Sequence, residues 1–128
     1  MTIALREGPD VDVDAIAELR ASCDFSPLSH DTIAAQLAGS RWIAHAYDGA
    51  RLVGFARAIS DGVTTGYVSS VMVDAAYRRR GIGRMLIAKL TGGRDGIKFV
   101  LHTRRDSAAF YATLGFADAP DMMVRDRR

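Results

Sequence analysis

The chain has 128 residues, 48% of them apolar and 25% charged, and a formal net charge of +2. This composition suits one globular domain over residues 1–128 and excludes a disordered or fibrous protein. No apolar run approaches the roughly 20 residues that cross a bilayer. Acidic and basic side chains stand close to the first residue, so we expect no signal peptide, no membrane association and a cytoplasmic location.

The first forty residues predict a strand and two helices. A short apolar run at Ile3–Arg6 reads as the strand. The aspartates of residues 10–14 then offer caps to a helix with apolar residues 16, 19 and 23 on one face. Pro27 interrupts the helical pattern. Ser29 can cap a second helix, which Gly39 ends.

The middle of the chain predicts an antiparallel meander. Two apolar runs, residues 42–47 and 52–59, flank the pair Asp48-Gly49, which tolerates the positive φ of a hairpin turn. A second Asp-Gly pair at 61–62 leads into a third strand over residues 67–73. These three strands should be neighbours in one sheet.

The second half alternates between helix and strand. The pattern predicts a helix over 82–91, a strand over 97–102, a helix over 107–114 and a last strand over 122–125. Such alternation implies a crossover connection and parallel pairing. The predicted fold class is therefore α/β with a mixed sheet, an antiparallel meander followed by a βαβα arrangement.

The junction between strand 67–73 and helix 82–91 is a candidate phosphate site. Three consecutive arginines, residues 78–80, precede Gly81 and Gly83 where the helix begins. A helix N-terminus has unpaired N–H groups and partial positive charge, and glycine lets a ligand approach the backbone. The alternative interpretation is a solvated arginine cluster before an ordinary helix.

Arg78-x-x-Gly81-x-Gly83 resembles the acyl-CoA pyrophosphate loop of the GNAT superfamily of N-acyltransferases. The segment from Phe110 to Phe116, Phe-Tyr-Ala-Thr-Leu-Gly-Phe, resembles the second motif of that superfamily. The two motifs share order, spacing and element type over residues 66–116, whereas the first forty residues carry little resemblance. The resemblance implies a GNAT-like fold in which strands 67–73 and 97–102 splay apart to form a cleft for acetyl-CoA.

The resemblance also implies which residues bind acetyl-CoA. The backbone of strand 67–73 would pair with the pantetheine arm, and the amides of residues 79–84 would hold the pyrophosphate beside the arginines. The implied set is Val71, Met72, Val73, Arg78, Arg79, Arg80, Gly81, Ile82, Gly83 and Arg84. An amide of Val71 or Met72 would polarise the thioester carbonyl. Arg104 and Ser107 depart from the Asn and Ala that the superfamily often has at these positions.

Tyr111 lies where the superfamily often places a general acid, so the resemblance makes it the candidate catalytic residue. A phenol with a pKa near 10 can protonate the departing thiolate. The alternative role is packing of its helix on the sheet. Cys23 has no activating neighbour and is interpreted as a plain buried or half-buried thiol.

The general base stays open, because no carboxylate occurs between Gly66 and Val73. His102, a water held by Ser69 or Ser70, and direct attack by an amine of low pKa all remain candidates.

The acceptor pocket would draw on the loop between the first two helices. Phe25 and Tyr67 could line an apolar slot, or Phe25 could belong to the core. Asp24 or Asp61 could pair with an ammonium group, or both could be solvated caps. The default acceptor is a small primary amine.

The resulting hypothesis is an acetyl-CoA-dependent N-acetyltransferase that acetylates a small-molecule amine by direct attack in a ternary complex. The alternative is a module that binds acyl-CoA without catalysis. We expect no nucleic-acid partner, because acidic residues are scattered through the chain, and no metal, because the three histidines are isolated and there is a single cysteine. The resemblance is compatible with a homodimer, and the arginine-rich composition hints at a bacterial origin.

Overall fold

The computed structural model describes residues 2–128 and contains one five-stranded sheet. Its elements follow the chain in the order β1 (Ala4–Glu7), α1 (Val13–Ser22), α2 (His30–Ala38), β2 (Trp42–Asp48), β3 (Arg51–Ser60), β4 (Thr65–Val73), η1 (Ala75–Tyr77), α3 (Ile82–Thr91), β5 (Lys98–Leu101), η2 (Arg105–Ser107) and α4 (Ala108–Ala112). The strands lie in sequence order, antiparallel from β1 to β4, and β5 pairs parallel to β4. The predicted mixed sheet is confirmed.

Local signals in the sequence explain most element boundaries. Asp12 caps α1 by accepting from the amide of Asp14, and Ser29 caps α2 by accepting from the amide of Thr32. Gly49 has the positive φ, +60°, that the turn between β2 and β3 requires. These caps and this turn are the ones that the sequence predicts.

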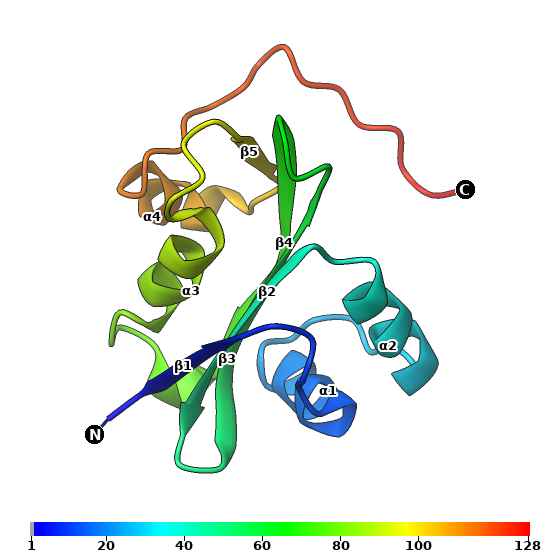
Figure 1. The fold of residues 1–128 in the computed structure, drawn as a ribbon, viewed down its shortest axis with the longest axis vertical. Coiled ribbons are helices and arrows are strands. Elements are labelled where there is room, and N and C mark those ends of the chain that lie inside the picture. Colours follow the sequence, from blue (N-terminus) through cyan, green and yellow to red (C-terminus); the bar gives the residue numbers. More distant parts are fainter. Residues whose placement is uncertain (1) are drawn as a thin grey trace.

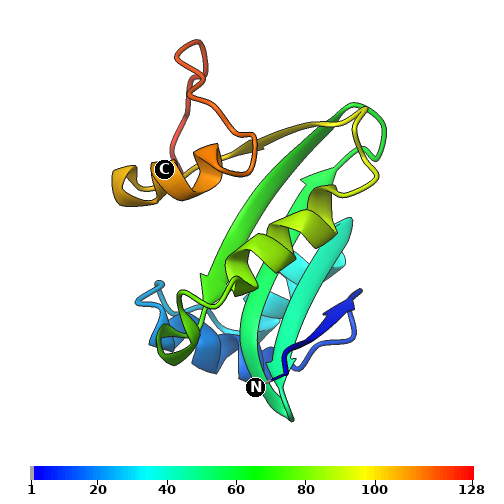
Figure 2. The ribbon, with the colours of Figure 1, turned by 90° about the vertical axis from the view of Figure 1, so that its left-hand side faces the viewer.

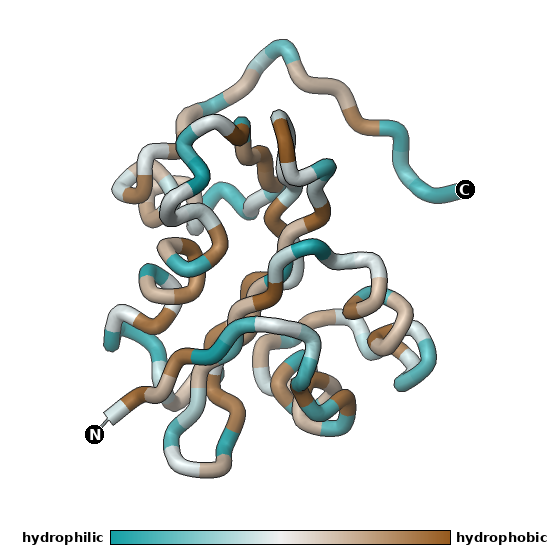
Figure 3. The backbone as a smooth tube through the Cα atoms, viewed as in Figure 1, coloured by the Kyte–Doolittle hydropathy of each residue, from teal (hydrophilic) through white to brown (hydrophobic). Residues whose placement is uncertain are grey.

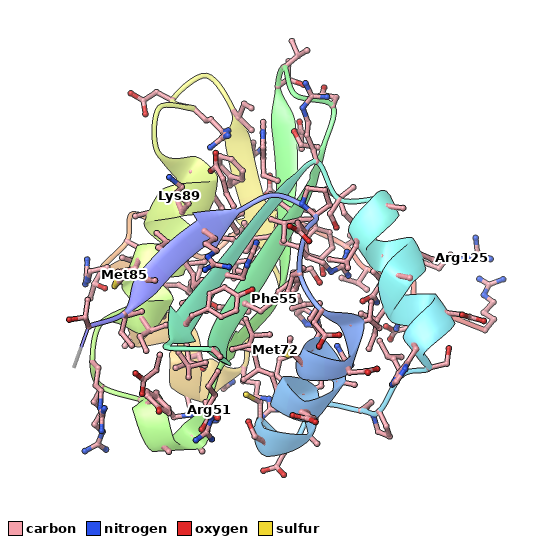
Figure 4. The ribbon with its side chains drawn as sticks, turned by 60° about the horizontal axis from the view of Figure 1, so that its bottom comes forward. Arg51, Phe55, Met72, Met85, Lys89 and Arg125 are labelled. Carbon is pink, nitrogen blue, oxygen red and sulfur yellow. The ribbon has the colours of Figure 1, made fainter. Side chains whose placement is uncertain are left out.

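The helices cover the sheet on both sides (Figures 1 and 2). Helices α1 and α2 lie on one face, where Phe55 and Met72 join their apolar side chains in one core cluster. Figure 4 labels both residues in the layer between the strands and α1. On the other face α3 packs on small residues of β2 and β3, and Phe116 after α4 joins this second cluster.

Helix α3 approaches the sheet closely because the strand beneath it carries a glycine. A Cβ built on Gly54 would lie 2.8 Å from Cγ2 of Ile82 and 3.1 Å from Cδ1 of Leu86. Neither distance leaves room for a side chain at residue 54, so the close position of α3 requires glycine there.

A bulge in β4 changes which face its residues occupy. Phe55 of β3 pairs with Met72, but Arg57 pairs with Ser69, so β4 contains one more residue than β3 between these pairs. Ser70 lies in this extra stretch with a φ of +56°. Val68 therefore packs on the α3 side, while Met72, four residues later, packs on the α1 side.

Strands β4 and β5 pair over only four residues. The register begins at Thr65 with Lys98 and ends at Val68 with Leu101. β5 ends at this pair, while β4 continues to Val73 without a partner on that side, which leaves the predicted opening between the two strands.

The C-terminal segment differs from the prediction. Residues 122–125 form no strand, and Met123 is 95% exposed. Figure 3 shows the segment running away from the sheet as an irregular chain. Its apolar run of residues 122–124 is too short to predict a strand by itself. Among residues 2–128 no helix has the length and apolar character needed to span a membrane.

Candidate active site

A cleft of about 850 Å³ opens where β4 and β5 separate. Its walls come from β4, the loop before α3, the chain after β5, and α4, with Phe25 contributed by the α1–α2 loop. Nearly all the residues singled out in the sequence line this one cleft: Phe25, Tyr67, Ser69, Ser70, Val71, Met72, Val73, Arg78, Arg79, Gly81, Ile82, Gly83, Arg84, His102, Arg104, Ser107 and Tyr111.

One wall of the cleft is the edge of β4 after the bulge. Ser69, Met72 and Val73 remain in register with β3 on one side, but residues 69–73 have no partner in β5 on the other. Val71 and Val73 turn their side chains toward the α3 side of the core. An unpaired strand edge offers backbone N–H and C=O groups to an extended ligand.

The N-terminus of α3 forms a second wall. Gly81, the residue before the helix, has a φ of +79° and no side chain that caps the helix. The first intrahelical bond runs from the amide of Met85 to the carbonyl of Gly81. The amides of residues 82–84 therefore have no partner within the helix, and they carry the positive end of its dipole.

The arginines of the loop have different surroundings. Arg78 and Arg79 line the cleft, and Arg84 does so while donating from Nη2 to Oγ1 of Thr113 at 3.1 Å. Arg80 does not line the cleft, and its guanidinium lies over the ring of Tyr77. Thus three of the four predicted arginine side chains lie at the cleft.

The two glycines of the motif have separate structural reasons. Gly81 occupies a left-handed conformation that glycine adopts without strain. Gly83 has ordinary backbone angles, but a Cβ there would lie 3.1 Å from Cζ of Phe110. The absent side chain of Gly83 lets α4 pack against α3, a role that the sequence pattern alone did not indicate.

Tyr111 lies half-buried in the cleft wall. Its ring packs edge-on against Phe110 and Phe116, with centroids 5.0 and 5.8 Å away. Burial raises the pKa of its phenol, so the hydroxyl is protonated at neutral pH. The aromatic motif therefore holds an uncharged proton donor at the cleft.

Only some of the residues suggested for the acceptor pocket reach the cleft. Phe25 and Tyr67 line it, as the sequence suggested for an acceptor slot, whereas Asp61 does not. Asp61 instead accepts from the amides of residues 63, 64 and 65 in the β3–β4 turn, and these bonds hold its pKa well below the ordinary range. Asp61 is a turn cap, the second of the two interpretations.

The thiol of Cys23 also faces this region. It is 7% exposed and donates to the backbone carbonyl of Val73 at 3.2 Å. This contact ties the end of α1 to the end of β4, and the prediction of a buried or half-buried thiol is confirmed. In residues 2–128 no three His, Cys, Asp or Glu side chains group together as they would around a metal ion.

Sequence reasoning missed Arg57, which lies directly behind the cleft wall. It is 8% exposed and donates from Nε to Oγ of Ser70 at 3.1 Å and from Nη2 to Oγ of Ser69 at 3.4 Å. The signal was present, since a lone arginine interrupts the apolar run of residues 52–59. The two serines considered as holders of a catalytic water thus contact a buried cation.

Comparisons with known proteins agree with this geometry. Residues 13–116 match the model of the acetyltransferase (GNAT) family. The chain is 34% identical to histone acetyltransferase TAP1 of Glycine max over 93% of its length, and 29% identical to chloroplastic serotonin N-acetyltransferase 2 of Oryza sativa subsp. japonica over 91%. It covers 58% and 62% of these two proteins, so it spans less than two-thirds of either.

The fold has close counterparts among solved structures. A GNAT-family acetyltransferase from Streptococcus pneumoniae superposes with a TM-score of 0.83 at 24% identity, over 99% of this chain and 100% of that one. The family model covers most of the chain, including both motifs and every wall of the cleft. The chain belongs to the GNAT family of acetyltransferases.

Proposed function

We propose that residues 1–128 act as a single-domain N-acetyltransferase, which moves an acetyl group from acetyl-CoA to an amine of a small molecule. The observation that carries this proposal is the meeting of three features in one cleft. They are the unpaired edge of β4, the uncapped N-terminus of α3 and the protonated phenol of Tyr111.

The cleft suits the separate parts of acetyl-CoA. The free edge at residues 71–73 would accept the amide-containing pantetheine arm as an added strand. An amide of Val71 or Met72 would stabilise negative charge on the thioester oxygen. The amides of residues 79–84, with Arg78, Arg79 and Arg84 beside them, would bind the pyrophosphate.

The chain's residues would support direct attack in a ternary complex. The amine nitrogen forms a bond to the thioester carbon, the carbon–sulfur bond breaks, and the nitrogen releases its proton to solvent water. Tyr111 would donate its proton to the departing thiolate and regain one from solvent. Cys23 donates to Val73 from a buried position, which argues against an acetylated-cysteine intermediate.

The first test is acetyl-CoA binding by calorimetry. Arg78→Ala combined with Gly81→Val removes a cation and forces a side chain into a left-handed position. We expect the double variant to weaken binding at least tenfold, about 1.4 kcal/mol. Folded wild-type protein that does not bind acetyl-CoA would overturn the proposal.

Gly93 provides a matched control for the glycine. Like Gly81 it has a positive φ, +73°, with nothing within 4 Å of a built Cβ, but it lies outside the cleft. Gly93→Val should reduce stability about as much as Gly81→Val while leaving acetyl-CoA affinity unchanged. Equal loss of affinity in both variants would show a general effect of strain.

The same measurement separates catalysis from simple binding. Binding followed by acetylation of an amine supports the enzyme. Binding with no acetyl transfer or thiol release across a broad panel of amines would favour the acyl-CoA-binding module, for which the absence of a carboxylate on β4 is the supporting observation.

A further inference from the structure

Two buried arginines lie on the α1/α2 face of the sheet, behind the acceptor end of the cleft. Arg57 in β3 and Arg20 in α1 are each 8% exposed. They lie close enough for the charge of Arg20 to contribute to lowering the pKa of Arg57, whose larger cause is burial. Both side chains line the same small internal space, together with Ser70.

Neither arginine has an acidic partner within the described chain. The ion pairs there join His30 to Asp14, Arg51 to Asp74 and Lys89 to Glu7. Arg20 donates instead to the backbone carbonyl of Ser26, at 2.6 and 3.1 Å. A buried charge is costly unless it is paired, so a positive region without a counter-ion favours a negative ligand.

The contacts of Arg57 go to hydroxyl groups. Besides Ser69 and Ser70, it reaches Oγ of Ser40 at 3.5 Å. A hydroxyl that accepts an N–H bond keeps its own proton for donation to another acceptor. Ser69 and Ser70 donate to no protein group among residues 2–128, and both line the cleft.

The bulge of β4 creates this arrangement. Arg57 pairs in register with Ser69, which places both on the same face of the sheet, and the left-handed Ser70 brings a second hydroxyl to the same guanidinium. Tyr67, two residues before Ser69, continues this face along the cleft. The cleft therefore presents two hydroxyl donors backed by a buried positive charge.

We propose that Ser69, Ser70 and Arg57 recognise a carboxylate on the acceptor, so that the amine acetylated in this cleft belongs to an amino acid or a similar aminocarboxylate. This inference rests on the proposed function, because it assigns the substrate class of the same site. Ser69 and Ser70 donate to the two carboxylate oxygens, and Arg57 neutralises the charge from behind. The serines bind the acceptor and do not act as a base.

Arg20 is a positioning residue in this site. Its guanidinium lies over the ring of Phe25, 5.3 Å from the centroid, and holds the Ser26 carbonyl of the same loop. Phe25 lines the same cleft as Ser69 and Ser70. Arg20 thus fixes the loop that faces the carboxylate site and adds to its positive potential.

The test compares amino acids with their carboxamides. The two members of each pair share a side chain and an α-amino group, and only the acid carries a carboxylate. Rates are measured as thiol release from acetyl-CoA over a pH range, and kcat/KM is expressed per free amine, because the amide also lowers the pKa of its own amine. We expect the preferred acid to exceed its carboxamide at least tenfold. Equal or better use of carboxamides would overturn the proposal.

Substitutions then assign the preference to Arg57. Arg57→Met should remove the preference for the acid while leaving acetyl-CoA affinity unchanged, and Arg57→Lys should retain part of it. A purely structural role would reduce the rates of both members of a pair equally. Arg125→Met, in the exposed C-terminal segment (Figure 4), is the matched control and should retain the full preference.

Two further measurements keep the proposal falsifiable. If Arg57→Met does not fold, the double variant Ser69→Ala, Ser70→Ala takes its place. In this variant the ratio of kcat/KM for the acid to kcat/KM for the carboxamide should fall at least tenfold. If the protein binds acetyl-CoA but acetylates nothing, the proposed catalysis fails, and calorimetry with N-acetyl amino acids and their carboxamides on the CoA-loaded protein tests the site alone. If the acids bind more tightly than the carboxamides, and the serine variant lacks this difference, the site is supported. Equal binding of acids and carboxamides by the wild-type protein overturns it.

Discussion

The two faces of the sheet are packed in contrasting ways. On the α3 face, alanines and a glycine of β2 and β3 meet the apolar side of α3. On the α1/α2 face the core includes larger side chains such as Phe55 and Met72, and the buried Arg20, His45 and Arg57 lie on this side. Small residues let α3 lie close to the sheet on one face, whereas large and polar side chains fill the space between the sheet and the helices on the other.

This difference separates two ways of building a binding site. The α3 face brings the backbone amides of a helix N-terminus to the cleft. The side chains on this face contribute by letting α3 lie close to the sheet, and they do not contact the ligand through particular functional groups. The α1/α2 face brings particular functional groups to the cleft from β3, β4 and the α1–α2 loop. We expect the first kind of site to suit the cosubstrate shared by the family and the second to set the acceptor.

Gly54→Val is the largest test of the closely fitted face. The new side chain would meet Ile82 and Leu86, where even a Cβ lies 2.8 and 3.1 Å away. We expect a loss of about 3 kcal/mol in the free energy of unfolding, measured by urea denaturation. Gly96→Val is the control, because Gly96 has ordinary φ and nothing within 4 Å. Similar stability of both variants would show that α3 can move away from the sheet.

Tyr111→Phe tests whether the α3/α4 side contributes chemistry as well as packing. The ring and its contacts with Phe110 and Phe116 remain, and only the proton donor is lost. We expect kcat to fall about 100-fold with little change in acetyl-CoA affinity. Tyr47→Phe, which removes a hydroxyl hydrogen-bonded to His45 outside the cleft, should leave kcat unchanged. An unchanged kcat in Tyr111→Phe would remove the phenol from the mechanism.

The pH profile offers a second view of Tyr111. Because burial raises its pKa above the ordinary value near 10, the donor form persists through neutral and mildly alkaline pH. The wild-type kcat should therefore show no loss from this group until the pH exceeds about 10, and Tyr111→Phe should lack that alkaline loss. A Tyr111-dependent loss near pH 8 would contradict the protonated donor.

Asp61→Asn should have the smallest effect on the protein, because Asp61 lies in the β3–β4 turn and belongs to neither packed face of the sheet. The charged carboxylate accepts three backbone amides in the turn, and its folded-state pKa is depressed. Its contribution to stability is present above the unfolded pKa of about 4 and is lost as pH falls toward the folded value. The variant should lower Tm by a few degrees at pH 7 and by less at pH 3. A difference that grows on acidification, or an equal effect of Asp121→Asn in the C-terminal segment, would contradict this.

The sequence predicted what depends on local pattern and not what depends on distant side chains. Helix caps at Asp12 and Ser29, the hairpin at Gly49 and the helix beginning at Ile82 follow from neighbouring residues, so they were predictable. The environment of Arg57 depends on a one-residue bulge in the next strand, which periodicity does not reveal. The strand expected at 122–125 is wrong for a related reason, since local pattern does not show whether a segment will dock on a distant sheet edge such as that of β5.

Ser70 combines an unfavourable backbone conformation with a side-chain contact to a buried arginine. A non-glycine residue in the left-handed region costs about 1 kcal/mol or more, and glycine would adopt the same φ of +56° without that cost. Glycine at position 70 would relieve that strain, but it would also remove the hydroxyl that accepts from the buried Arg57, and a lost acceptor for a buried donor costs about as much. The strained backbone of Ser70 is thus the conformational cost of presenting a hydroxyl to a buried guanidinium, a cost that a residue with only a turn-forming role would avoid by being glycine.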